Sequence, residues 1–212
     1  MYYKLLLNTI ISLAICSILV IISYYYIDKP LAEWIYQQTN WILQKQIRQW
    51  VIEITQILHL LGLVLIILII LKKTLSNNLS KLELTSLATI INLIVTDHIK
   101  DTLKLVFGRS NLIVYTKNIH AWLQNPQHGF HPFHGGAAYQ SFPSGHTAAA
   151  FAIASIIWIA YPKWRWLCII SCLLIILCLL WFNYHFFSDI IAGAFLGTIT
   201  GAYTSYLFIL NK

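Results

Sequence analysis

Two histidines with polar neighbours are the residues of this chain best suited to chemistry. His146 follows Pro143-Ser144-Gly145 and stands directly before a run of small and apolar residues. Ser144 can cap a helix that begins here, and Gly145 lets backbone N–H groups approach a ligand closely. The free N–H groups and the positive dipole end of a helix N-terminus bind anions such as phosphate. His146 would then stand beside a bound anion, in the position of a general acid that protonates a leaving oxygen.

The second histidine, His185, is followed four residues later by the carboxylate of Asp189. Where a turn or a helix start brings such a pair together, the carboxylate fixes the imidazole tautomer and makes the other ring nitrogen a better nucleophile. A buried histidine that is merely satisfied by a nearby aspartate has the same spacing. The pair therefore indicates a catalytic site only in combination with other features.

A third polar feature is a charged stretch at the end of an apolar segment. Asp97, Lys100, Asp101 and Lys104 are spaced i, i+3, i+4 and i+7, which places them in one stripe of a helix. Charges at membrane depth are costly and normally face the bundle interior or a wet cavity. We therefore expect the stripe to point inward, with Arg109 shortly after it. Ion pairs at a snorkelling helix end would be the functionless alternative.

The composition indicates a membrane protein. Of 212 residues, 58% are hydrophobic and only 10% are charged, whereas about a quarter of a soluble domain is charged. The mean hydropathy is +0.70. The net charge of +7 would suggest nucleic acid in a soluble protein, but no basic face with interleaved aromatic residues accompanies it, so anionic membrane lipid is the simpler partner. The four cysteines lie in apolar runs and are interpreted as buried hydrophobic residues, not as disulfides.

The apolar runs predict an all-α, polytopic bundle of six transmembrane helices that forms one domain over residues 1–212. A spanning helix needs roughly 20 mainly apolar residues. The first run is too long for a signal peptide and lacks a small-residue cleavage site. The six predicted spans are Leu5–Ile27, Val51–Leu71, Leu84–Phe107, His146–Tyr161, Leu167–Tyr184 and Ile190–Leu210.

Two further patterns concern how these helices sit. Residues 28–50 carry Trp34, Trp41 and Trp50 among polar residues, which predicts an amphipathic stretch at the membrane interface. In the last span, small residues recur every four positions as a doubled GxxxG pattern, which predicts close packing against a neighbouring helix. The glycines of this pattern are Gly193, Gly197 and Gly201.

The short loops predict the orientation. Lys72, Lys73 and Lys81 crowd one loop, and Lys163 and Arg165 occupy another. Short loops rich in lysine and arginine stay cytoplasmic. Both termini are then cytoplasmic, and all three polar features lie on the opposite, periplasmic face. The total number of basic residues is equal on the two sides, so the assignment depends on their density in short loops.

Taken together, the motifs resemble those of the type 2 phosphatidic-acid phosphatase family, and specifically a bacterial branch of these integral-membrane lipid phosphatases. The family carries Lys-x6-Arg-Pro, Pro-Ser-Gly-His and Ser-Arg-x5-His-x3-Asp. The second motif is intact at Pro143–His146, and the third survives as His185-x3-Asp189. The stretch from Gly129 through His146 also resembles the bacterial branch. The motifs span residues 104–189.

This resemblance implies the roles of the site residues. His185 would attack phosphorus and form a phosphohistidine, Asp189 would orient His185, and His146 would protonate the leaving group. It implies no metal and no cofactor, and a bacterial inner membrane location. The phosphate oxygens would be held by Lys104, Arg109, Ser144 and Gly145.

The chain departs from the family pattern at two places. Counted from Lys104, the Arg-Pro of the first motif falls on Asn111-Leu112. The bacterial branch often has Lys-x3-Gly-Arg, so Arg109 is expected to serve instead. The arginine of the third motif falls on Leu179. Either activity is weak, or another polar residue compensates: Lys100, Asn183 or a loop histidine.

Three alternatives remain at this point. A metal-dependent membrane enzyme could use imidazoles of the loop between His120 and His134, which also contains His128 and His131. A transporter could use the charged stripe as an ion path. A phosphatase-like protein could bind lipid phosphate with little turnover. The substrate could be phosphatidic acid, phosphatidylglycerol phosphate, undecaprenyl pyrophosphate or a lipid A phosphate, and the sequence indicates no oligomeric state.

Overall fold

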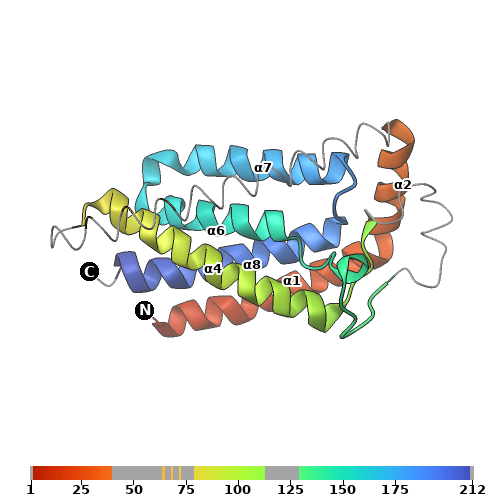
Figure 1. Cartoon of the computed structure of the whole chain (residues 1–212), viewed down its shortest axis with the longest axis horizontal. Coiled ribbons are helices and arrows are strands. Elements are labelled where there is room, and N and C mark those ends of the chain that lie inside the picture. Colours follow the sequence, from red (N-terminus) through yellow and green to blue (C-terminus); the bar gives the residue numbers. More distant parts are fainter. Residues whose placement is uncertain are drawn as a thin grey trace.

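Long helices run side by side along the molecule, and a short helix crosses one end of them (Figure 1). The computed structural model describes residues 2–39, 64, 68, 72, 79–112 and 129–210. The π-turn Tyr206–Leu210 extends the last helix, and 3₁₀ turns lie at Ala137–Tyr139 and Pro162–Trp164. The α-helices are α1 (Tyr2–Tyr26), α2 (Asp28–Gln38), α4 (Lys81–Phe107), α6 (Gly145–Ala160), α7 (Arg165–Trp181) and α8 (Phe187–Ser205).

Four of the helical segments are long and apolar enough to cross a membrane. They are Tyr3–Tyr26, Lys81–Phe107, Pro162–Trp181 and Phe187–Leu210, and α6 is a shorter apolar helix. The outer faces of α1 and α7 expose many leucine and isoleucine side chains, as expected for surfaces that meet lipid. The all-α, polytopic fold is thus confirmed. The predicted span Val51–Leu71 lies outside the described residues except for positions 64 and 68.

The doubled GxxxG pattern brings α8 against α6, as predicted. A Cβ atom added to Gly197 would lie 2.1 Å from the carbonyl oxygen of Ala148, and one added to Gly193 would lie 2.5 Å from that of Ser144. Gly201 meets the same helix at Ser155. Only glycine permits this approach, so these residues set the distance between the two helices that carry the histidine motifs.

Buried polar side chains tie α4 to the same pair of helices. The Asn92 amide donates to the carbonyl oxygen of Ala152 at 3.3 Å and accepts from the Thr204 hydroxyl at 3.1 Å. The hydroxyls of Thr96 and Thr200 are 2.8 Å apart. Hydrogen bonds between helices of this kind stabilise packing in an apolar environment. Together with the glycine contacts they make α4, α6 and α8 the centre of the bundle.

The crossing helix α2 has one buried and one exposed face, as predicted for the start of the amphipathic stretch. It buries Asp28, Ala32 and Ile35, while Trp34 is exposed. Ala32 packs in a small core with Phe186, from the link before α8. Residues 40–50, with Trp41 and Trp50, lie outside the described residues.

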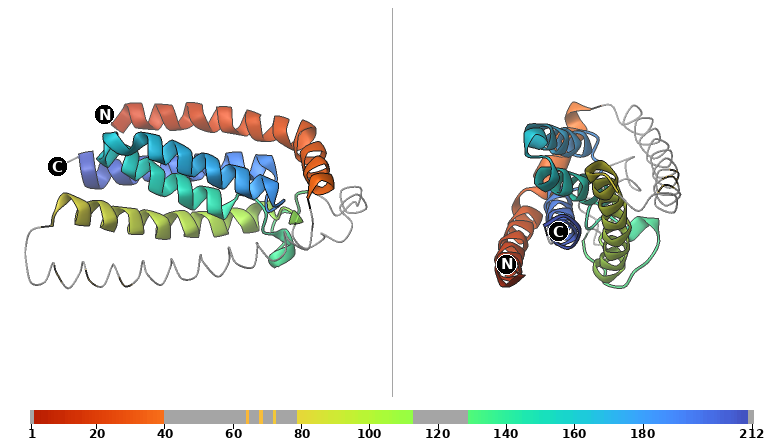
Figure 2. Two further views of the ribbon diagram at one scale, coloured as in Figure 1. Left: turned by 90° about the horizontal axis from the view of Figure 1, so that it is seen from above. Right: turned by 90° about the vertical axis from the view of Figure 1, so that its left-hand side faces the viewer.

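The chain ends lie opposite the crossing helix. Both termini are at one end of the bundle, whereas α2, the end of α4 and the starts of α6 and α8 gather at the other (Figures 1 and 2). The three polar features therefore lie together at one end of the bundle, as their predicted placement on one face requires.

The four cysteines are free, as predicted, but not all are buried. Cys16, Cys168 and Cys172 are buried, whereas Cys178 is exposed. The expectation of burial was wrong for Cys178 because a spanning helix also presents an apolar face outward, where a small apolar side chain is equally suitable.

Candidate active site

The Pro-Ser-Gly-His segment forms the start of α6. Ser144 is the N-cap, as predicted: its hydroxyl oxygen accepts from the Thr147 N–H at 3.4 Å. The Ser144 N–H donates to the carbonyl oxygen of Asp189 at 3.0 Å, which ties this turn to α8. Gly145 and His146 are the first two residues of the helix. The helix N-terminus thus sits beside the third motif, with the geometry that favours anion binding.

The two motif histidines face one another across this turn. The ring centroids of His146 and His185 are 6.4 Å apart. The Tyr184 ring contacts both histidines: its centroid lies 5.1 Å from that of the His146 ring and 5.3 Å from that of the His185 ring. Two imidazoles separated by 39 residues in sequence are therefore brought together by the packing of α8 on α6.

Asp189 lies directly behind His185. Its Oδ2 is 3.4 Å from Nδ1 of His185, which is within ion-pair distance but does not form a well-aligned hydrogen bond. The same oxygen accepts from the Ser141 hydroxyl at 2.6 Å and from the Phe186 N–H at 3.0 Å. The carboxylate is thus fixed in the first turn of α8, on the Nδ1 side of the His185 ring.

The surroundings of His185 favour its neutral form. Burial lowers the pKa of His185, and the contact with Asp189 opposes that shift. The positive charges of Lys104 and Arg109 lower the pKa further. A neutral imidazole is the form that can act as a nucleophile.

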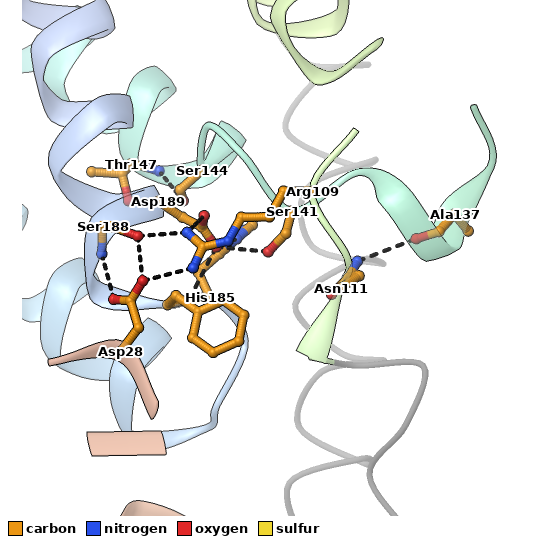
Figure 3. A network of polar contacts seen from close by, with 11 residues as sticks. Asp28, Arg109, Asn111, Ala137, Ser141, Ser144, Thr147, His185, Ser188 and Asp189 are labelled. Carbon is orange, nitrogen blue, oxygen red and sulfur yellow. Dashed lines mark hydrogen bonds and ion pairs between the residues drawn. The ribbon is translucent and has the colours of Figure 1, made fainter. Parts of the chain in front are cut away.

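Arg109 is fully buried and bound by acidic side chains (Figure 3). Its Nη1 donates to Asp189 Oδ1 at 2.5 Å and to the Ser188 hydroxyl at 2.5 Å. Its Nη2 donates to Asp28 Oδ2 at 2.6 Å. Nε has no hydrogen-bond partner among the described residues. Both terminal nitrogens of the expected phosphate ligand are therefore engaged with the protein.

Aromatic rings enclose the same guanidinium. Its central carbon lies 4.3 Å from the ring centroid of Phe186, 5.1 Å from that of Phe130 and 5.3 Å from that of Tyr24. The backbone of Arg109 pairs with Phe130 in an isolated antiparallel bridge. The cation–π contacts add to the ion pairs that hold the guanidinium, and the bridge positions the backbone that carries it.

The left-handed residue Gly108 allows the chain to turn from α4 into this bridge. Its φ is 51°, and an added Cβ would lie 1.8 Å from the carbonyl oxygen of His131. The His131 N–H donates to the Gly108 carbonyl at 2.9 Å. The turn therefore delivers Arg109 inward and pins the histidine-containing segment against the end of α4.

Sequence reasoning missed Asp28 and Ser188. Asp28 Oδ1 accepts from the Ser188 N–H at 3.0 Å, and Oδ2 accepts from its hydroxyl at 2.5 Å. One feature of the sequence could have indicated Asp28: it directly follows an apolar run, where an unpaired charge is costly. No local spacing connects it with a serine 160 positions later.

Lys104 is the cation best placed to meet a phosphate. It is partly buried and makes no hydrogen bond or ion pair with any residue in the described ranges, yet it is close enough to affect His185. Lys100 lies against the start of α6, where an added Cβ on Gly145 would be 2.9 Å from its stem. Its ammonium, however, is paired with Asp97 at 2.5 Å and with Asp101 at 3.0 Å.

The expectation that the whole charged stripe points inward was wrong. The side chains of Asp97 and Asp101 are 58% and 64% exposed, whereas that of Lys100 is 16% exposed. Residues 97 and 101 share one edge of the stripe, and residues 100 and 104 share the other. A small rotation of α4 therefore turns the lysines toward the site and the aspartates outward.

Neither the two positions that differ from the family motifs nor the possible substitute Asn183 provides a cation at the site. Leu179 is buried near the end of α7. The side-chain amide of Asn183 donates to the carbonyl oxygen of Ala32 at 3.1 Å, so it joins the link to α2. The Asn111 amide is 3.4 Å from the carbonyl oxygen of Ala137.

Of the four loop histidines, the structure describes His131 and His134. The ring centroids of His131 and His134 are 5.8 Å apart, and both rings pack against Tyr139. Within the described ranges, no group of three or more histidine, cysteine or acidic residues is arranged to hold a metal ion. His120 and His128 lie outside these ranges.

Two apolar cavities lie away from the histidines. One of 940 Å³ is bounded by α4, α6 and α7, and one of 440 Å³ is bounded by α6, α7 and α8. Both are nearer the end of the bundle that carries the termini, and neither is lined by His146 or His185. The polar cluster around the two histidines is therefore separate from both of these cavities.

Comparisons with known proteins agree with this fold. The PAP2 superfamily matches residues 84–211, which is more than half of the chain. No curated protein matches significantly. The fold is similar to the crystal structure of the first transmembrane PAP2 type phosphatidylglycerolphosphate phosphatase from Bacillus subtilis, with a TM-score of 0.61, 15% identity, and coverage of 100% of this chain and 98% of that one. The chain is therefore a multi-pass membrane protein that belongs to the PAP2 superfamily, the family of type 2 phosphatidic-acid phosphatases.

Proposed function

We propose that the protein is an integral-membrane phosphatase that hydrolyses a lipid phosphate or pyrophosphate through a phosphohistidine on His185. The observation that carries the proposal is the approach of His146 and His185 to 6.4 Å between ring centroids, with Asp189 behind His185. An attacking atom within about 3–3.5 Å of phosphorus and an acid within about 3 Å of the leaving oxygen require a gap of this order.

In the first step, Nε2 of His185 attacks phosphorus and the bond from phosphorus to the lipid oxygen breaks. His146 gives its proton to that oxygen, and Asp189 stabilises the positive charge that develops on His185. In the second step, His146 takes a proton from water, and the resulting hydroxide displaces His185 from phosphorus. Inorganic phosphate leaves and both histidines return to their starting forms.

The phosphate oxygens would be held by the ammonium of Lys104 and by the start of α6 at Ser144 and Gly145. A cation without a partner and a helix N-terminus suit a group whose charge spreads over three oxygens. Arg109 was expected in the same role. Its contacts with two carboxylates favour an indirect contribution instead.

The reaction requires no metal in this proposal, because His185 is the nucleophile and Lys104 supplies positive charge. The site would lie at the periplasmic face of a bacterial inner membrane, since Lys81 at the start of α4 and Lys163 and Arg165 at the start of α7 lie at the opposite end of the bundle (Figure 1). A bilayer location and the superfamily favour a lipid substrate. Because the structural neighbour is described as a phosphatidylglycerolphosphate phosphatase, that lipid is the first to test.

The test is phosphate release by purified protein in detergent with EDTA present. The panel contains phosphatidylglycerol phosphate, phosphatidic acid, undecaprenyl pyrophosphate and lipid A. We expect release from at least one of them, inhibition by vanadate, and a trapped phosphoprotein that is stable in alkali and labile in acid. His185→Ala should lose both signals, and His98→Ala, which removes an exposed histidine of α4, should keep them. Turnover that needs added Zn²⁺ or Mg²⁺ would favour the histidine-loop alternative.

A binder of lipid phosphate with little turnover is the second candidate. It is favoured by Leu179, an apolar residue where the family has arginine, and by the engagement of Arg109 with Asp28 and Asp189. Vesicles containing the panel lipids would then bind the protein without releasing phosphate. Loss of binding in Lys104→Ala would place that binding at the same site.

A further inference from the structure

We propose that Asp28 is a positioning residue for the reaction, and that Arg109 acts through Asp189 without touching the substrate. Asp28 belongs to α2, outside the region that carries the motifs, and its carboxylate is fully buried. The inference rests on the proposed phosphatase function, and it adds a residue and reassigns another.

The contacts of Asp28 reach both partners of the nucleophile. One carboxylate oxygen binds the Ser188 N–H in the first turn of α8, one residue before Asp189. The other binds Nη2 of Arg109, whose Nη1 holds Oδ1 of Asp189. Asp28 therefore fixes the helix that carries Asp189 and, separately, the guanidinium that orients its carboxylate.

The charge balance explains why two carboxylates are needed. Arg109 alone would neutralise Asp189 and leave little negative charge to stabilise a positive His185. With Asp28 present, the guanidinium is shared between two carboxylates, and the cluster of three keeps one net negative charge. That charge is adjacent to the imidazole that becomes positive in the proposed first step.

The groups around His185 fix the direction of a pH effect. Asp189 of α8 favours the charged imidazole, while Lys104 of α4 and Arg109, which follows the end of α4, oppose it. His146 of α6 and Tyr184, in the link between α7 and α8, also lie beside His185. Removing the charge of Asp28 leaves Arg109 less neutralised, so the neutral form of His185 persists to lower pH.

The experiment compares wild-type protein with Asp28→Asn and with the control Glu33→Gln, which removes a carboxylate from the same helix. For Asp28→Asn we expect kcat to fall roughly 10- to 100-fold, the range that is typical when an outer hydrogen-bond partner of a metal-bound imidazole is removed. The acid limb of the kcat–pH profile should move to lower pH by roughly half a unit. This is the effect on the His185 pKa of removing one charge about 10 Å away at an effective dielectric constant of about 40. KM and the inhibition constant of inorganic phosphate should stay within about twofold, and Glu33→Gln should behave as wild type.

A second variant covers the risk that an unpaired buried arginine prevents folding. Asp28→Asn combined with Arg109→Gln leaves no unpaired cation there. Because Arg109 lowers the pKa of His185, its loss should move the acid limb up, opposite to the single variant. The inhibition constant of inorganic phosphate should again be unchanged, since Arg109 makes no substrate contact in this proposal.

Three results would overturn the inference. One is wild-type kcat and pH profile in Asp28→Asn. Another is a tenfold or larger rise in the phosphate inhibition constant of the double variant, which would make Arg109 a phosphate ligand. The third is failure of both variants to fold while Glu33→Gln folds, which would assign the network to folding alone. If wild-type protein and Glu33→Gln release no phosphate at all, the proposed function itself fails.

Discussion

The charge state of His185 connects the geometry of the site with a measurable rate. Burial lowers its pKa below the usual value of about 6.5. The neutral, nucleophilic form is present above the pKa, so kcat/KM should rise with pH and reach half its plateau below pH 6.5. The acid limb of the pH–rate profile checks this expectation.

Substrate ionisation could produce a similar limb, because a phosphate monoester has a pKa of about 6. Asp189→Asn separates the two causes. It removes the carboxylate that raises the pKa of His185, so the limb of the remaining activity should move to lower pH. A small remainder is expected, since loss of the orienting carboxylate in comparable triads costs on the order of 10⁴-fold. An unchanged limb would assign it to the substrate.

Lys104 provides the second prediction at this scale. Its ammonium has no partner in the described part of the chain, so its charge is available to phosphate. Lys104→Ala should raise the inhibition constant of inorganic phosphate by roughly 10- to 100-fold, the loss of one charge-assisted hydrogen bond of about 1.5–3 kcal/mol. Lys163→Ala, at the other end of the bundle, is the matched control. Equal inhibition of both variants would exclude Lys104 from the phosphate site.

At the scale of elements, the contact of α6 with α8 sets the separation of the two histidines. Gly197→Ala would place a methyl group 2.1 Å from the Ala148 carbonyl, so the helices would have to move apart. We expect a loss of about 1–3 kcal/mol of stability and a lower kcat, measured by thermal unfolding in detergent and by phosphate release. Gly135→Ala, which meets nothing within 4 Å, should change neither property.

The same contact holds the two histidines together without the two motif positions that differ here. Ser144 binds the backbone of Asp189, and Ser141 binds its carboxylate. These links join the start of α6 to the start of α8 without using Asn111 or Leu179. The pair of histidines is therefore positioned by elements that this chain retains.

For the whole molecule, the arrangement of helices makes a test of sidedness possible. The site and the termini are at opposite ends of the bundle (Figure 1). A cysteine introduced at the exposed residue Gly135 should react with a membrane-impermeant maleimide from the periplasm, in a Cys178→Ser background. A cysteine introduced at Lys163 should react only after the inner membrane is permeabilised. The reverse pattern would place the site in the cytoplasm.

Local patterns in the sequence were sufficient for much of this protein. Apolar runs predicted the helical membrane fold because a spanning helix must satisfy its backbone internally and face lipid. The N-cap at Ser144 and the glycine face of α8 follow from short-range chemistry, and both were predicted correctly. The pairing of His185 with Asp189 was readable because the two residues are one helical turn apart.

Tertiary structure decided what depends on distant segments and on helix rotation. Asp28 reaches Arg109 and Ser188 only because α2 folds back across the end of the bundle. Nothing in the spacing of Arg109 distinguishes a phosphate ligand from a buried ion pair, since both need a cation at that position. The outward turn of Asp97 and Asp101 likewise depends on how α4 packs, because adjacent edges of one helical stripe look equivalent until a neighbouring helix covers one of them.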